Sequence, residues 1–294
     1  MRLNAIDLSQ VEGRTGTDRP SKPPETQAGS AEHDLSQERS VVRASSANAA
    51  EEDAQNLYDA WHSRYEVDLD ADAPWHRLVK VTISEKDLAS KDVLEIGCGR
   101  GGFSCWLARQ LYTPKRICAT DFSGAAVEKG ERAARALSLA GIEWQVGDIQ
   151  AISHPDASFD TIVSCETIEH VPDPRKALAE LVRVLKPGGR LFLTTPNYFG
   201  IMGLYRLHFR LRGRTFTEEG QPINNFLLLP LTRRWVKSAG LRITFSTSRG
   251  FYIPFPGRPM LKMPFLERSR TLRYWFGLHS LIVAEKIAAK VAPN

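Results

Sequence analysis

Residues 93–102, with the sequence VLEIGCGRGG, constrain the fold more than any other part of the chain. A short apolar run breaks into glycines, and a helix-like segment, residues 103–111, follows at once. This pattern is typical of a buried strand that enters a tight turn before a helix. Because Gly97 and Gly99 lack Cβ atoms, the turn can adopt positive φ, and a nucleotide-like ligand can approach the main chain.

The composition indicates a globular protein with one full-sized core. Of the 294 residues, 42% are hydrophobic and 25% are charged, and the formal net charge is +5. The four cysteines form no CxxC pair and fall in expected core elements, so we expect no disulfide framework. No uncharged run approaches the roughly 20 residues that span a bilayer, and the N-terminus lacks the apolar block of a signal peptide. We therefore expect a cytoplasmic protein.

The first 90 residues differ from the rest of the chain. Residues 1–50 are rich in Ser, Thr, Glu, Gln, Ala and Pro, and we predict that they form a disordered tail. Within residues 51–90, apolar side chains at helical spacing predict cap helices at 54–64 and 75–83. The main domain is expected over residues 91–288.

From residue 92 onward, short apolar strands alternate with helical patterns. The predicted strands are 93–96, 116–120, 144–146, 161–165, 190–194, 241–245 and 279–284. This alternation predicts right-handed crossovers and an α/β fold, with a mostly parallel sheet covered by helices on both faces. Two segments, at about 196–229 and 250–277, are longer than ordinary connections, and we predict that these insertions form a lid.

One helix of this domain has well-defined ends. Asp173 is predicted as the N-cap, and Pro174 occupies the first helical position. The spacing predicts a helix over 174–185 that Pro187-Gly-Gly stops.

Polar residues stand at the carboxyl ends of successive predicted strands, where ligands bind in open α/β sheets. Asp121 ends the second strand, and its carboxylate can accept both hydroxyls of a ribose, although it could also cap the next helix. Asp148 follows the third strand and can accept a hydrogen bond from the exocyclic amine of a base. Ile149 beside it could pack on the face of that base. A simple turn is the alternative for this pair.

Taken in order, these features resemble the class I S-adenosylmethionine-dependent methyltransferases. The motifs that carry the resemblance are LEIGCGRG at 94–101, Asp121, GD at 147–148, FD at 159–160 and LKPGGRL at 185–191. A nicotinamide dehydrogenase is the competing assignment, and the full set of motifs favours the methyltransferases. The resemblance implies a Rossmann-like sheet of seven strands, with the last strand antiparallel and inserted between the fifth and the sixth.

The resemblance also implies a binding site for S-adenosylmethionine. It places Gly97 and Gly99 at the methionine portion, Asp121 at the ribose, and Asp148 with Ile149 at the adenine. Further residues expected to bind this cofactor are Glu95, Phe122 and Cys165, and an arginine that precedes the core, Arg77.

The side of the methyl acceptor is expected in residues 165–174, CETIEHVPDP. If this segment forms one helical turn, Glu166, Glu169 and His170 share a face. They could then bind a hard cation such as Mg²⁺, or His170 beside Glu169 could act as a general base on an acceptor hydroxyl. A third possibility is that the segment only shapes the wall of the pocket.

The same stretch is similar to the O-methyltransferases of ubiquinone biosynthesis, in which the two glutamates and the histidine form the metal site. That resemblance implies an insertion that contacts the membrane directly after the fifth strand. Residues 199–214 lie at this place and alternate apolar and basic residues, as an interfacial segment does; a substrate lid and a solvated basic loop are the alternatives. The insertion at 250–277 has no counterpart in that family.

These features predict direct in-line methyl transfer from S-adenosylmethionine to a hydroxyl oxygen of a small-molecule acceptor. RNA 2′-O-methylation is one alternative, because ExxEH also occurs in enzymes that methylate the terminal hydroxyl of small RNAs. The chain shows neither their further histidine nor a stacked aromatic platform, so we expect no nucleic-acid partner. The other alternative is a scaffold that binds the cofactor without catalysis, and the retained Asp121 and Asp148 argue against it. The acceptor, the pathway and the oligomeric state are not set by the sequence.

Overall fold

The computed structural model describes residues 52–213, 217–218, 221–222, 225–255 and 258–288. The predicted tail at residues 1–50 lies outside this part of the chain. The first described element is a helix at 52–63.

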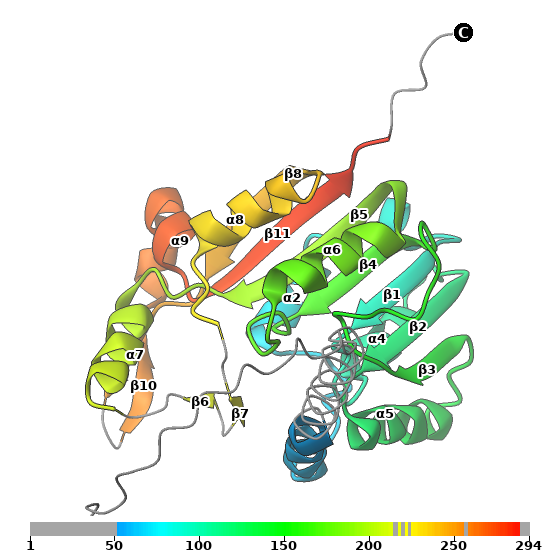
Figure 1. Ribbon diagram of the computed structural model, residues 1–294, viewed down its shortest axis with the longest axis horizontal. Helices are drawn as coiled ribbons and strands as arrows, with labels where there is room; N and C mark the ends of the chain where they lie inside the picture. The colour runs from blue at the N-terminus through cyan, green and yellow to red at the C-terminus, as the bar shows by residue number, and fades with distance from the viewer. Residues whose placement is uncertain (1–51, 214–216, 219–220, 223–224, 256–257, 289–294) are drawn as a thin grey trace, which may run out of the picture. The chain divides into compact units, whose positions relative to one another are not determined.

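A seven-stranded sheet forms the centre of the domain, in the order β3-β2-β1-β4-β5-β11-β8 (Figure 1). Its strands are β1 (Asp92–Ile96), β2 (Arg116–Asp121), β3 (Ile142–Val146), β4 (Phe159–Cys165), β5 (Leu185–Pro196), β8 (Leu241–Arg249) and β11 (His279–Lys286). Strands β1 to β5 pair in parallel, whereas β11 runs antiparallel to both of its neighbours. The predicted sheet is therefore confirmed, including the antiparallel last strand between the fifth and the sixth.

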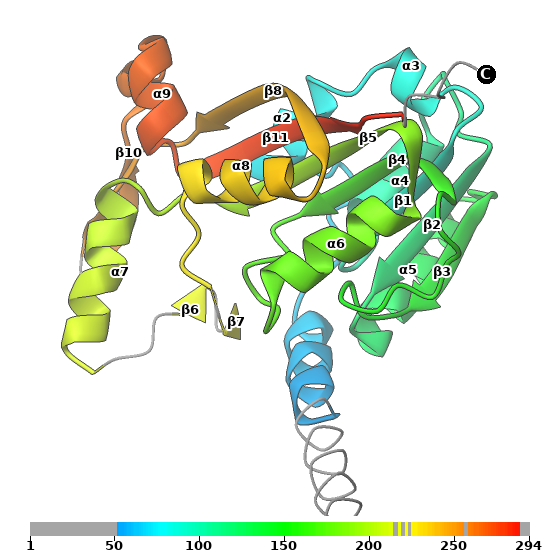
Figure 2. The same cartoon turned by 45° about the horizontal axis from the view of Figure 1, so that its top comes forward.

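Helices cover both faces of this sheet, as Figure 2 shows. On one face lie α6 (Pro174–Val184) and α8 (Leu229–Ser238), and on the other lie α2 (Pro74–Lys80), α3 (Glu85–Leu88), α4 (Gly102–Ala108) and α5 (Gly124–Ala136). Each face has its own apolar core. Leu178, Leu181 and Val236 belong to the first core, and Phe103 and Leu107 belong to the second. The strands between them are buried on both sides, as parallel strands usually are.

Helix α6 begins as predicted but ends earlier. The Asp173 carboxylate accepts hydrogen bonds from the backbone N–H groups of Arg175 (2.9 Å) and Lys176 (3.1 Å), which confirms it as the N-cap. The last helical residue is Val184, because Leu185 adopts an extended conformation and pairs with Phe159 of β4. Pro187 and the two glycines after it thus lie within strand β5 and do not stop the helix.

Both insertions leave the sheet at the same edge. The first contains α7 (Ile201–Leu211), β6 (Thr217–Glu218) and β7 (Gln221–Pro222), and the second contains β9 (Tyr252–Phe255), β10 (Arg258–Lys262), the 3-10 helix η1 (Pro264–Arg268) and α9 (Arg270–Phe276). His279, the first residue of β11, lies opposite Pro196 at the end of β5 and Arg249 at the end of β8. The insertions therefore begin at the carboxyl ends of the parallel strands. None of the described helices is long and apolar enough to cross a membrane.

Candidate functional site

The glycine turn after β1 adopts the left-handed conformation for which glycine is suited. Gly97 has a φ of 72° and Gly99 a φ of 52°. A Cβ atom at Gly97 would lie 2.2 Å from Oγ1 of Thr167, so the turn also needs glycine for the close approach of the segment after β4. At Gly99 the nearest atom to such a Cβ would be Cε1 of His62, at 3.5 Å. This turn therefore presents backbone at the carboxyl edge of the sheet.

Asp121, at the end of β2, is fixed against this turn. One carboxylate oxygen accepts a hydrogen bond from the Gly99 N–H (2.7 Å), and the other accepts one from the Ser123 N–H (2.9 Å). The N-cap of α5 is Ser123, whose hydroxyl accepts a hydrogen bond from the Ala126 N–H (3.1 Å). A carboxylate offers about four lone-pair positions, so two backbone bonds leave Asp121 with capacity to accept two further hydroxyl donors.

The helix at 52–63 brings three residues to this site that the sequence analysis did not identify. The Asp59 carboxylate accepts hydrogen bonds from the Ser123 hydroxyl and from the Ala125 N–H (3.1 Å). Nε2 of His62 lies 4.0 Å from the Asp121 carboxylate, and burial lowers the pKa of this histidine. Burial, together with the nearby charges of Glu169 and Asp121, raises the pKa of Tyr58 to about 12. The signal in the sequence that could have identified these three residues is a group of polar side chains within one helix.

The predicted adenine residues form a turn after β3. The Asp148 carboxylate accepts a hydrogen bond from the Gln150 N–H at 2.8 Å, which is the geometry of an Asx turn. Ile149 is 5% exposed and packs within the core beneath α6. Phe122, after β2, is half-buried, and its ring centroid lies 6.2 Å from that of Tyr58. Their roles toward an adenine stay predictions.

The remaining predicted cofactor residues lie in different surroundings. Glu95 is buried within β1 and accepts a hydrogen bond from the Ser104 hydroxyl. Cys165 is a core residue at the end of β4, and burial raises the pKa of its thiol. The Arg77 side chain is 65% exposed and forms an ion pair with Asp72 (3.0 Å). Among the described residues, its side chain pairs with Asp72 and not with a residue of the glycine turn.

The segment after β4 does not form the predicted helical turn. Glu166 has a φ of 48°, and this left-handed residue separates the strand from a turn at residues 168–170. Glu169 is fully buried, and its carboxylate lies 3.7 Å from Nε2 of His170. Glu166 instead lies beside His279, with 3.9 Å between its carboxylate and Nδ1. The three predicted metal ligands thus do not share one face.

No group of three or more His, Cys, Asp or Glu side chains in the described part of the chain is arranged to hold a metal ion. The expected Mg²⁺ therefore has no structural support and stays a prediction from the sequence. The structure instead places His279 beside Glu166, in the segment expected to face the acceptor. Because β11 is antiparallel, its first residue reaches the edge at which the parallel strands end. The family resemblance already implied an antiparallel last strand. Residue 279, at the start of that strand, could therefore have been predicted to lie near the carboxyl ends of the parallel strands.

We expect the buried carboxyl of Glu95 to make stability depend on pH. Burial raises its pKa from 4.5 to about 8, so between these values the folded protein keeps a proton that the unfolded chain releases. The free energy of unfolding should then fall as pH rises through this window, by up to about 1.4 kcal/mol per pH unit. Urea unfolding of Glu95→Gln from pH 5 to 8 should show a flatter slope. The exposed Glu128→Gln is the matched control, and equal slopes for Glu95→Gln and the unmodified protein would contradict the assignment.

Comparison with known proteins agrees with this architecture. The family described as "Methyltransferase domain" matches residues 94–193. The chain is similar to the ubiquinone/menaquinone biosynthesis C-methyltransferase UbiE of Geotalea daltonii, at 32% identity over 54% of this chain and 70% of that protein. It is also 32% identical to a probable tocopherol O-methyltransferase of Oryza sativa subsp. japonica, over 46% of this chain and 40% of that protein.

A solved S-adenosylmethionine-dependent methyltransferase from Mesorhizobium loti shares the fold. Its TM-score is 0.53 at 15% identity, and the match covers 74% of this chain and all of that one. Two independent observations support the same family. One is the sheet with its glycine turn and Asp121, and the other is the Geotalea daltonii protein, of which this chain covers more than two thirds. The chain belongs to the class I S-adenosylmethionine-dependent methyltransferases.

Proposed function

We propose that this methyltransferase transfers the methyl group to a hydroxyl oxygen of a small-molecule acceptor. Support for a small molecule comes from relatives whose names refer to quinone and tocopherol methylation, of which one is a C- and the other an O-methyltransferase. The observation that favours oxygen is the Glu169–His170 pair after β4. A hydroxyl acceptor must lose its proton, and a histidine beside a buried carboxylate can take it.

The residues of the glycine turn fit S-adenosylmethionine. The free acceptor capacity of Asp121 matches the two hydroxyls of a ribose, and the turn at Gly97 and Gly99, where the family resemblance places the methionine portion, lies directly beside it. Tyr58 and His62 of the helix at 52–63 cover Phe122 and Asp121 from outside. When bound, S-adenosylmethionine supplies an electrophilic methyl group on its sulfonium sulfur.

Replacing Asp121 should weaken the binding of S-adenosylmethionine, and the variant should still fold. Each hydrogen bond to a charged group contributes about 1.5 kcal/mol or more, so losing two should weaken binding about 100-fold in Asp121→Ala. Isothermal titration calorimetry with S-adenosylmethionine measures this change. Glu128→Ala, which removes an exposed carboxylate from α5, is the control and should bind normally. Normal affinity in Asp121→Ala would refute the proposed cofactor site.

Most of the rate acceleration comes from aligning the acceptor with the methyl group of the cofactor. Holding the acceptor oxygen in line with the methyl carbon can lower the barrier by roughly 7 to 11 kcal/mol. His170 then removes the hydroxyl proton, and the adjacent carboxylate of Glu169 stabilises the imidazolium that forms. The loop that carries them is fixed from the first insertion, because the Asn225 N–H donates a hydrogen bond to the Glu169 carbonyl (2.9 Å).

His170→Gln and Glu169→Gln should lower turnover about 10²- to 10⁴-fold and leave the affinity for S-adenosylmethionine unchanged. An acceptor can be found by incubating the enzyme with ¹³C-methyl-labelled S-adenosylmethionine and extracts of the source organism. The ¹³C shift of the product then distinguishes an O-methyl from a C- or N-methyl group. The exposed His208→Gln serves as control. A C-methyl product or full activity of His170→Gln would contradict the proposal, and loss of turnover in EDTA would favour the metal.

We also propose that α7 contacts a lipid surface. Three leucines, Leu204, Leu207 and Leu211, lie at positions i, i+3 and i+7 and are 69%, 46% and 79% exposed. Exposed Arg210 and Arg212 stand next to this row. An apolar stripe beside basic residues is the pattern of a helix that lies in a membrane interface.

Binding of the enzyme to vesicles tests this contact. The protein should sediment with vesicles of phosphatidylcholine and phosphatidylglycerol, and the double substitution Leu204→Ser and Leu207→Ser should reduce the bound fraction several-fold. Leu137→Ser, at the end of α5, removes an exposed leucine elsewhere and should bind like the unmodified protein. If the α7 variant sediments equally well, this helix does not contact the lipid.

A further inference from the structure

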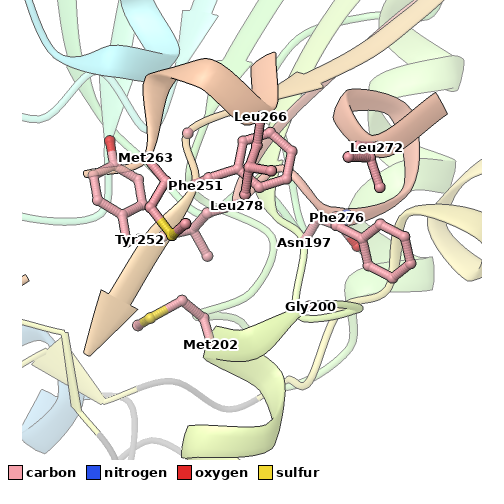
Figure 3. A pocket seen from close by; sticks show the side chains of 11 residues that line it. Asn197, Gly200, Met202, Phe251, Tyr252, Met263, Leu266, Leu272, Phe276 and Leu278 are labelled. Atoms are coloured by element: carbon pink, nitrogen blue, oxygen red, sulfur yellow. The ribbon is translucent and has the colours of Figure 1, made fainter. Parts of the chain in front are cut away.

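The two insertions line an apolar cavity of about 180 Å³ that is partly open to solvent. Figure 3 shows the side chains that line it, which come from separate elements: Met202 of α7, Tyr252 of β9, Met263 and Leu266 at η1, and Phe276 of α9. No charged side chain is among the described residues that line it. The cavity is therefore suited to an uncharged, apolar group.

Among the described lining residues, Asn197 has the one side-chain amide, and this amide forms hydrogen bonds with backbone groups. Its nitrogen donates to the carbonyls of Trp275 (2.9 Å) and Gly277 (3.1 Å). Its oxygen accepts from the N–H groups of Phe199 (3.3 Å) and Leu229 (3.0 Å). Asn197 thus joins the two insertions and does not add a polar contact for a ligand.

The cavity borders the edge at which the reaction is proposed. Asn197 directly follows β5, and Leu278, another lining residue, directly precedes His279. His279 lies 3.9 Å from Glu166 at the end of β4 and packs edge-on against the Tyr252 ring. Since neighbouring strands lie about 4.8 Å apart, the strands whose ends border the cavity, β5, β11 and β8, are roughly 10 to 20 Å from β1 and its glycine turn. One acceptor molecule that extends from this cavity toward the cofactor can span this distance.

The volume limits what can enter. A dry apolar cavity of about 150 Å³ is known to bind benzene. A cavity of similar size thus accommodates one six-membered ring or an alkyl segment of comparable volume.

We infer that this cavity is the subsite that selects the methyl acceptor, by binding its ring or short alkyl segment and directing its polar end past Glu166 and His279 toward the Glu169–His170 pair. The inference rests on the proposed function, since it assigns the acceptor class of the same site. It gives the second insertion, whose sequence matches no motif, the role of setting specificity.

Primary alcohols from propanol to octanol, with benzyl alcohol as the ring probe, test the subsite in the full chain. Met202 and Met263 line the cavity, so their ¹³C-labelled methyl groups report binding in NMR spectra. Affinity should rise about fourfold for each added methylene, the equivalent of about 0.8 kcal/mol, and level off once the cavity is filled.

Two filling variants provide the second measurement. Met202→Trp and Leu266→Trp should each weaken octanol binding at least tenfold, read from the Met263 signal. Leu207→Trp, on the exposed side of α7, should not change it. Dissociation constants that do not depend on chain length, or that stay unchanged in both filling variants, would overturn the inference.

Calorimetry with S-adenosylmethionine on the same samples separates the two proposals. If S-adenosylmethionine binds and no alcohol shifts the methionine signals, the subsite is wrong and the proposed function stands. If the alcohols bind and S-adenosylmethionine does not, the proposed function fails, and the assignment of the cavity to an acceptor fails with it.

Discussion

The carboxylate of Asp121 joins the parts on which the site depends. It bridges the glycine turn after β1 and the start of α5 by accepting one backbone N–H from each. Hydrogen bonds to a charged acceptor are stronger than those between neutral groups, so one side chain fixes two strand ends in register. The helix at 52–63 then packs over the same carboxylate through His62. Any ligand at this edge meets a preorganised surface.

Much of the fold could be predicted because its signals are local. Strand β1 is buried on both sides, so its apolar run is continuous, and Asp173 with Pro174 marks the start of α6 through the chemistry of two adjacent residues. Strand order was available only through the family resemblance, since no local pattern specifies which strands become neighbours. The end of α6 was missed because pairing of Leu185 with Phe159 ends the helix before its proline does.

The candidate site was harder to predict because its residues come from distant segments. The spacing of Glu166, Glu169 and His170 suggested a helical turn after β4. In the structure Thr167 packs closely against Gly97, and Glu166 adopts a left-handed backbone conformation. The Glu166 side chain therefore lies beside His279. Tyr58, Asp59 and His62 precede the glycine turn by over thirty residues, and only tertiary packing shows that their helix covers the site. Neither insertion carries a motif, so its cavity could not be anticipated.

The reversed direction of β11 has a consequence for the order in which the enzyme is assembled. The residues predicted to bind the cofactor end at Cys165, whereas the second insertion and His279 are synthesised more than eighty residues later. Domains tend to fold from their N-terminal part during synthesis. A nascent chain can thus pair β1, β2 and β3 while the acceptor side is still missing. Insertion of β11 between β5 and β8 brings His279 to the edge at which the parallel strands end, so the same strand completes the sheet and the predicted acceptor side.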